Sequence, residues 1–147
     1  MVSARMAVTG CSVLDLYGGT GSLGFEALSR GAASVRYVDR NPALAREVAA
    51  AAAAFGWSDR LSVVVGRVEE TLRAKRGEYD LILIDPPYRD RNLEFLGELL
   101  PPARLVVVES DSPRSLGSAW HLIASRRYGG TQIGLFDQGE TRGEAVS

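Results

Sequence analysis

Short apolar runs alternate with amphipathic stretches along most of the chain. Five runs that contain valine, leucine or isoleucine predict strands, at residues 13–17, 34–39, 61–65, 79–84 and 105–109. The last two are apolar enough to be buried on both faces of a sheet. The stretches between them carry helical spacing, caps or good helix formers and predict helices, at residues 22–30, 43–55, 69–76 and 92–100. Two final runs, 120–128 and 131–136, flank Gly129-Gly130 and predict a hairpin. This order predicts an α/β, Rossmann-like fold with a doubly wound, mostly parallel sheet and a C-terminal antiparallel hairpin.

Composition narrows the class of protein. The 147 residues are 46% hydrophobic and 24% charged, which is typical of one globular domain, here expected over 1–147 with a lead-in at 1–11 and a frayed tail at 138–147. A net charge of −1 argues against a broad basic face for nucleic acid. Cys11 is the single cysteine, so an internal disulfide and a multi-cysteine zinc site are excluded, and no metal is expected. No apolar run has membrane-spanning length, and we expect a cytoplasmic protein.

A glycine-rich turn follows the first strand. Residues 19–24 read Gly-Thr-Gly-Ser-Leu-Gly, which matches the dinucleotide pattern Gly-x-Gly-x-x-Gly between a strand and a helix. Asp39 ends the next strand, where an acid can bind ribose hydroxyls. By pattern alone, a nicotinamide or flavin dinucleotide is therefore a valid interpretation.

The charge near this turn favours a different ligand. Asp15 lies just before the turn, and its carboxylate would repel a pyrophosphate. S-adenosylmethionine has no phosphate and carries a sulfonium and an ammonium group, so the same acid would attract it. The residues therefore favour the methyl donor over a dinucleotide, which stays open at this point.

The sequence Asp85-Pro86-Pro87-Tyr88 ends the fourth predicted strand. The two prolines cannot donate to a sheet ladder, so the strand must stop and leave an acid and an aromatic ring at its carboxyl end. In open α/β sheets ligands bind at that edge. A carboxylate, free backbone carbonyls and a flat ring could hold a planar group that bears an amino function.

These motifs together resemble a known family. The block Leu14–Ala32, the acid after the second strand, the Asp-Pro-Pro-Tyr sequence and the Tyr128–Thr131 turn are similar to the RsmD-like small-subunit ribosomal RNA guanine-N2 methyltransferases, over about residues 12–137. The resemblance implies a class I methyltransferase fold, S-adenosylmethionine as cofactor and methylation of guanine N2 in 16S ribosomal RNA. The near-neutral net charge favours an assembled small-subunit particle over naked RNA as the substrate, and we expect a monomeric enzyme.

The resemblance also implies roles for individual residues. Catalysis would rest on Asp85, Pro86, Pro87 and Tyr88. Cofactor binding would rest on Asp15, Tyr17, Gly18, Gly19, Thr20, Gly21, Asp39, Arg40, Arg67, Val68 and Asp85. Apart from the resemblance, Arg89 and Arg91 are candidates for RNA contacts, because they lie just past the Asp-Pro-Pro-Tyr sequence.

The chain departs from the family pattern, and other functions stay open. Only a dozen residues precede the first strand, where the family usually has a segment with an Arg-Pro-Thr element. The turn after the third strand has Gly66 and Arg67 where an acid often faces the adenine, and Glu69 could replace it only if the turn shifts. Alternatives are a DNA adenine-N6 methyltransferase and a cofactor-binding module without activity; a protein glutamine methyltransferase usually has Asn in place of Asp85.

Overall fold

A computed structural model describes residues 7–74, 77–87 and 92–139. Its strands are β1 (Ser12–Leu16), β2 (Ser34–Asp39), β3 (Leu61–Val65), β4 (Tyr79–Ile84), β5 (Ala103–Ser110), β6 (His121–Tyr128) and β7 (Thr131–Asp137). Its helices are α1 (Ser22–Ser29), α2 (Pro42–Ala54), α3 (Val68–Ala74) and α4 (Leu93–Leu99).

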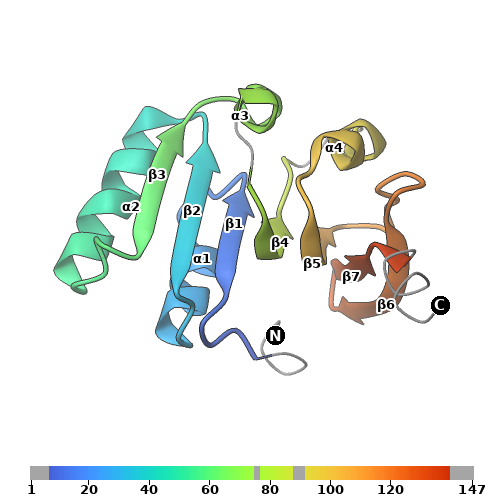
Figure 1. Cartoon of the computed structure of the whole chain (residues 1–147), viewed down its shortest axis with the longest axis horizontal. Coiled ribbons are helices and arrows are strands. Elements are labelled where there is room, and N and C mark those ends of the chain that lie inside the picture. Colours follow the sequence, from blue (N-terminus) through green and yellow to red (C-terminus); the bar gives the residue numbers. More distant parts are fainter. Residues whose placement is uncertain (1–6, 75–76, 88–91, 140–147) are drawn as a thin grey trace.

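The strands form one seven-stranded sheet in the order β3-β2-β1-β4-β5-β7-β6 (Figure 1). The first five strands are parallel, and β7 pairs antiparallel with both β5 and β6. The chain order reverses between β1 and β4, which creates a crevice at the carboxyl ends of these strands. The glycine turn after β1 and the Asp-Pro-Pro segment after β4 therefore meet at one edge of the sheet.

Helices cover both faces of the sheet. Side chains of α3 and α4 pack with Leu14 and Leu16 of β1, while α1 packs with Val13 and α2 packs with Tyr37 of β2. Successive residues of a strand point to opposite faces, so Asp15 lies on the same face as Val13 and points towards α1. The doubly wound arrangement predicted from the sequence is confirmed.

Local sequence explains where α2 starts. The Asn41 side chain accepts hydrogen bonds from the backbone of Ala43 (2.9 Å) and Leu44 (3.1 Å), and Pro42 occupies the first helical position. Because β2 ends two residues earlier at Asp39, this cap places the helix start beside the crevice.

The predicted elements are all present, and within the described residues each end either matches its prediction or is shifted by one or two residues. The predicted end of the third helix, at residues 75–76, lies outside the described residues. Strand β1 ends at Leu16 rather than at Tyr17, because Tyr17 adopts a left-handed backbone with φ 57° and starts the turn. Strand β6 begins at His121 rather than at Trp120, because the buried indole donates from Nε1 to the Gly97 carbonyl at 3.0 Å.

Some predicted residues lie outside the part of the chain that the structure describes. They are Tyr88, Arg89 and Arg91, residues 1–6 of the predicted lead-in and residues 140–147 of the predicted tail.

Gly97→Ala should lower the stability of the folded chain. A Cβ at Gly97 would overlap the backbone carbonyl of Leu116, which cannot rotate away. We expect a loss of about 2–4 kcal/mol in the free energy of unfolding, despite the roughly 1 kcal/mol that alanine gains in a helix. Urea denaturation measures it. Gly130→Ala is the control, because a Cβ added at Gly130 would have no heavy atom within 4 Å; equal stability of both variants would contradict the close contact.

Candidate functional site

The glycine turn is held in place by β2. A Cβ at Gly18 would overlap the ring of Tyr37, and the Tyr37 hydroxyl donates to the Gly19 carbonyl at 2.6 Å. Burial, together with the charges of Asp39 and Asp15, raises the pKa of Tyr37 to about 12, so the hydroxyl keeps its proton at neutral pH. Gly18 thus allows a contact that no other residue permits, and the turn has one fixed shape.

Asp39 joins the end of β2 to this turn. Its carboxylate accepts hydrogen bonds from the backbone N–H of Gly19 and of Asn41, both at 2.9 Å. The Asp39 carbonyl accepts from the Gly66 N–H at 3.0 Å, which ties the turn after β3 to the same point. A carboxylate oxygen accepts more than one hydrogen bond, so Asp39 can still receive the hydroxyl groups of a ligand.

Asp15 is buried beneath the turn, with 1% of its surface exposed. Among the described residues, its Oδ2 atom has no hydrogen-bond partner, and a Cβ at Gly24 would lie 2.9 Å from that atom. Burial raises the pKa of Asp15 to about 7; the Gly24 N–H bond opposes this, while the charges of Asp85 and Asp39 add to it. Because its surface is covered, Asp15 would influence a ligand in the crevice only through its charge and through the turn above it.

Two cavities meet at the end of β4. The first cavity, of about 440 Å³, is lined by Tyr17, Asp39, Arg40, Gly66, Arg67, Val68, Glu69, Asp85 and Pro87. The second cavity, of about 300 Å³, is lined by Asp85, Pro86, Pro87, Glu109, Ser110, Asp111, Arg114, Gly130 and Thr131. Asp85 and Pro87 belong to both, so the Asp-Pro-Pro segment forms the wall between them.

The first cavity collects most of the residues expected to bind the cofactor. Tyr17, Asp39, Arg40, Arg67, Val68 and Asp85 line it. Gly18, Gly19, Thr20 and Gly21 form the turn next to Tyr17, and Asp15 lies below that turn. Glu69 also lines the cavity, from the first turn of α3, so an acid is present in this wall close to the turn after β3.

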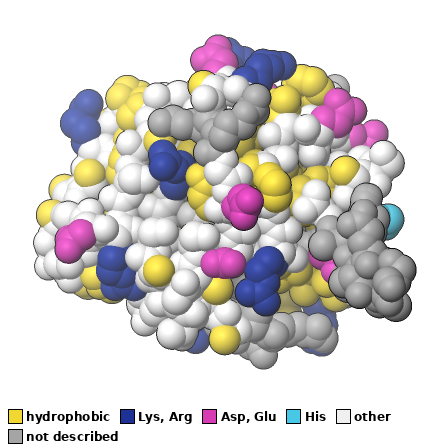
Figure 2. Space-filling view, viewed as in Figure 1, with side chains coloured by type: hydrophobic (Ala, Val, Ile, Leu, Met, Phe, Trp, Pro, Cys, Tyr) yellow, Lys and Arg dark blue, Asp and Glu magenta, His cyan; other side chains and the backbone are white. Residues whose placement is uncertain are grey.

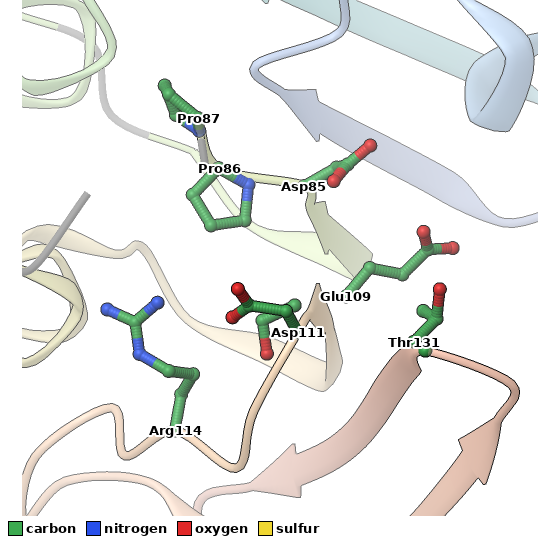
Figure 3. Close-up of a pocket in the computed structure, with 9 residues that line it drawn as sticks. Asp85, Pro86, Pro87, Glu109, Asp111, Arg114 and Thr131 are labelled. Carbon is green, nitrogen blue, oxygen red and sulfur yellow. The ribbon is translucent and has the colours of Figure 1, made fainter. Parts of the chain in front are cut away.

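The second cavity was not foreseen beyond the Asp-Pro-Pro segment. Figure 3 shows Glu109 and Thr131 reaching it from β5 and β7, with Asp111 and Arg114 coming from the segment after β5. Burial raises the pKa of Asp85. The pKa of Glu109 is also raised, mainly by burial and to a smaller extent by the charges of Asp85 and Glu26. An acid at the carboxyl end of an apolar strand was the available signal for Glu109, and Asp85 directly follows such a strand.

The charged surface is mixed. Figure 2 shows acidic and basic side chains interspersed over the visible face, without a continuous basic field. Within the described part of the chain, no three His, Cys, Asp or Glu side chains gather as metal ligands, and no helix is long and apolar enough to cross a membrane.

The chain is similar to two ribosomal RNA methyltransferases. The chain is 28% identical over 141 residues to ribosomal RNA small subunit methyltransferase D of Escherichia coli, covering 90% of the chain and 70% of that protein. It is 28% identical over 127 residues to the Haemophilus influenzae protein of the same name, covering 79% of the chain and 66% of that protein.

The fold has solved counterparts. The structure of yhhF from Escherichia coli, provisionally named a methyltransferase, superposes with a TM-score of 0.78 at 26% identity, over 89% of this chain and 77% of that one. The fold is that of the class I methyltransferases. A family profile described as "Conserved hypothetical protein 95" matches residues 1–137. The chain belongs to this family.

Proposed function

We propose that the chain is an S-adenosylmethionine-dependent methyltransferase that modifies the N2 amino group of a guanine in 16S ribosomal RNA. The observation that carries the proposal is the pair of cavities that share the Asp85 and Pro87 wall. Methyl transfer needs a donor and an acceptor on either side of one short gap, and this wall lies between two such spaces. The names of the relatives from Escherichia coli and Haemophilus influenzae support ribosomal RNA as the acceptor.

The first cavity fits S-adenosylmethionine better than a dinucleotide. Its volume of about 440 Å³ is within the usual range for small-molecule sites. The carboxylates of Asp39 and Glu69 line it, Asp85 forms its wall, and the unpartnered Oδ2 of Asp15 lies beneath the turn. Arg40 and Arg67 also line this cavity, so the preference rests on the acids nearest the turn. A negative charge on Asp85 and Asp15 would attract a sulfonium and disfavour a pyrophosphate. Asp39 would hold the ribose hydroxyls, and the turn from Gly18 to Gly21 would hold the methionine part.

The residues at the wall suit an amino group. S-adenosylmethionine, when bound, supplies an electrophilic methyl group. The lone pair of an exocyclic amine is delocalised into the base, and the Asp85 carboxylate and the Pro86 carbonyl can each accept one of its N–H groups. Two such bonds fix the amine so that its lone pair faces the first cavity, and Tyr88 would stack on the base for about 1–3 kcal/mol. Catalysis is then chiefly positioning, and the proton leaves the product ammonium to water.

The substrate would be an assembled small-subunit particle and the enzyme a cytoplasmic monomer. The net charge of −1 and the mixed surface predict weak, salt-sensitive binding to naked RNA. Arg89 and Arg91 would contact a phosphate next to the inserted nucleotide. A folded particle supplies further contacts that a short RNA lacks.

Tritium transfer tests the proposal. The chain is incubated with S-adenosylmethionine that carries a tritiated methyl group. Each reaction contains one substrate: small ribosomal subunits, naked 16S ribosomal RNA or duplex DNA. The subunits and the RNA come from a strain that lacks the gene for this chain. We expect label in the small subunits, and less in naked RNA. Label in DNA alone would indicate the adenine-N6 alternative. Tight binding of S-adenosylhomocysteine without label in any substrate would indicate a binding module, and binding of NADH in its place would indicate a dinucleotide protein.

Asp39→Ala should weaken the cofactor complex. The change removes the ribose acceptor and also the bond that holds the Gly19 N–H. Two hydrogen bonds to a charged group correspond to at least about 30-fold in affinity. Calorimetric titration with S-adenosylhomocysteine measures it, with Glu70→Ala on the exposed face of α3 as the control. Unchanged affinity in the Asp39 variant would count against the ribose assignment.

A further inference from the structure

Three neighbouring strands each present one polar side chain to the second cavity. Ile84 of β4 and Val108 of β5 are paired, so Asp85 and Glu109 are the next residues at the carboxyl ends of adjacent parallel strands. Glu109 is paired with Ile133 of β7, and Thr131 lies two residues from Ile133, on the same face of the sheet. The sheet therefore lines up Asp85, Glu109 and Thr131 in that order.

The three side chains share one side of the cavity. In Figure 3 the carboxylates of Asp85 and Glu109 and the hydroxyl of Thr131 lie on one side, and Arg114 lies on the other. The influence of Asp85 on the pKa of Glu109 agrees with their proximity. Glu109 lines the second cavity and is not part of the wall of the first, so a role with the cofactor does not account for its placement.

This order matches one nucleobase edge. The Watson–Crick edge of guanine presents the N2 amino group, the N1–H and the O6 oxygen in sequence, which is donor, donor, acceptor. The chain offers a carboxylate, a second carboxylate and a hydroxyl, which is acceptor, acceptor, donor. Adenine presents its amino group next to N1, which is an acceptor without a hydrogen. The N1 lone pair would face the Glu109 carboxylate, so neither acceptor would have a donor.

We propose that Glu109 selects guanine by accepting its N1–H while Asp85 holds the N2 amino group, with Thr131 donating to O6. The inference rests on the proposed function and deepens it, since it assigns the residue that distinguishes guanine from adenine. Glu109 touches the base rather than the methyl donor. Its effect is therefore expected on the choice of base and on the rate, without an effect on cofactor affinity.

Glu109→Gln tests the inference on small subunits whose target guanine has been mapped with the wild-type enzyme. Its carboxamide keeps the shape, loses the charge and can present a donor to N1 of adenine. We expect kcat/KM on the guanine substrate to fall about 10- to 100-fold. On subunits with adenine at the mapped position, the ratio of guanine to adenine methylation should fall by at least about tenfold. Affinity for S-adenosylhomocysteine should stay at the wild-type value, and the thermal midpoint should not fall below that of the wild type.

Glu26→Gln is the matched control, because it makes the same change of acid to amide and should leave the guanine-to-adenine ratio at the wild-type value. Glu26 lies on α1 and its charge acts on Glu109, yet it is not part of the wall of either cavity. If Glu109→Gln does not fold, Thr131→Val carries the same test, with a several-fold lower rate and a lower guanine-to-adenine ratio expected. An unchanged ratio, or loss of S-adenosylhomocysteine affinity in Glu109→Gln, overturns the inference while the proposed function stands. If the wild type transfers no methyl group to guanine, the proposed function fails and the inference with it.

Discussion

Asp85→Ala is expected to abolish methyl transfer while the affinity for S-adenosylhomocysteine stays within about tenfold of the wild type. The carboxylate lines both cavities. In the proposed mechanism it gives the cofactor only a favourable charge, whereas the amino group of the acceptor needs it as a hydrogen-bond partner. Loss of one preorganised polar group at a reacting centre typically lowers kcat by 10²- to 10³-fold or more. Single-turnover transfer to small subunits measures the rate, and calorimetry measures the affinity.

Two further variants test whether the loss of rate comes from the lost hydrogen-bond acceptor. Asp85→Asn keeps one carbonyl acceptor in the same place, so it should retain more activity than Asp85→Ala. Asp59→Ala makes the same truncation at an exposed position between α2 and β3, and should leave the rate unchanged. Turnover at the wild-type rate in Asp85→Ala would contradict the mechanism, and so would a loss of rate explained wholly by lost cofactor affinity.

Asp15→Asn is expected to stabilise the free chain at pH 8 and to weaken binding of S-adenosylmethionine more than of S-adenosylhomocysteine. Folding raises the pKa of Asp15 from its ordinary value near 4 to about 7. The folded chain therefore binds an extra proton between these values, and stability falls as the pH rises through this window. Between pH 5 and pH 8 the loss from this one group is on the order of 3 kcal/mol, which the asparagine variant avoids.

The cofactor comparison isolates the sulfonium. Both ligands carry the ammonium group, but only S-adenosylmethionine carries the sulfonium charge, so the ratio of their affinities reports the field of Asp15. We expect that ratio to fall about five- to tenfold in Asp15→Asn at pH 8. Urea denaturation at pH 5 and pH 8 and calorimetry with both ligands measure these effects, with Asp59→Asn as the control. An unchanged ratio together with an unchanged pH dependence of stability would show that Asp15 carries no charge at this site.

Much of the fold followed from local chemistry. The apolar runs that became β1, β4 and β5 are flanked by turns, prolines or acids, and Asn41-Pro42 set the start of α2. The ends of β1 and β6 depended on contacts that are distant in sequence. Tyr17 leaves the strand because the turn is bonded to β2, and Trp120 leaves it because its indole reaches α4.

The residues of the candidate site also differ in whether the local sequence predicts them. Asp39 and Asp85 could be placed from the sequence, because each ends a strand beside a recognisable turn. The burial of Asp15 under Gly24, and the second cavity with Glu109 and Thr131, depend on how α1, β5 and β7 pack. Residues that a hairpin brings to an active site from 20 or more positions away leave no local pattern, and pairing of β5 with β7 is what reveals Thr131.

The most direct test of the central claim identifies the methylated nucleoside. Small subunits from a strain without the gene are treated with the chain and S-adenosylmethionine, digested to nucleosides and measured by mass spectrometry. We expect N2-methylguanosine to rise with the wild-type chain and not to rise with Asp85→Ala. A rise in N6-methyladenosine instead, or no methylated nucleoside although the chain binds S-adenosylhomocysteine, would contradict the claim.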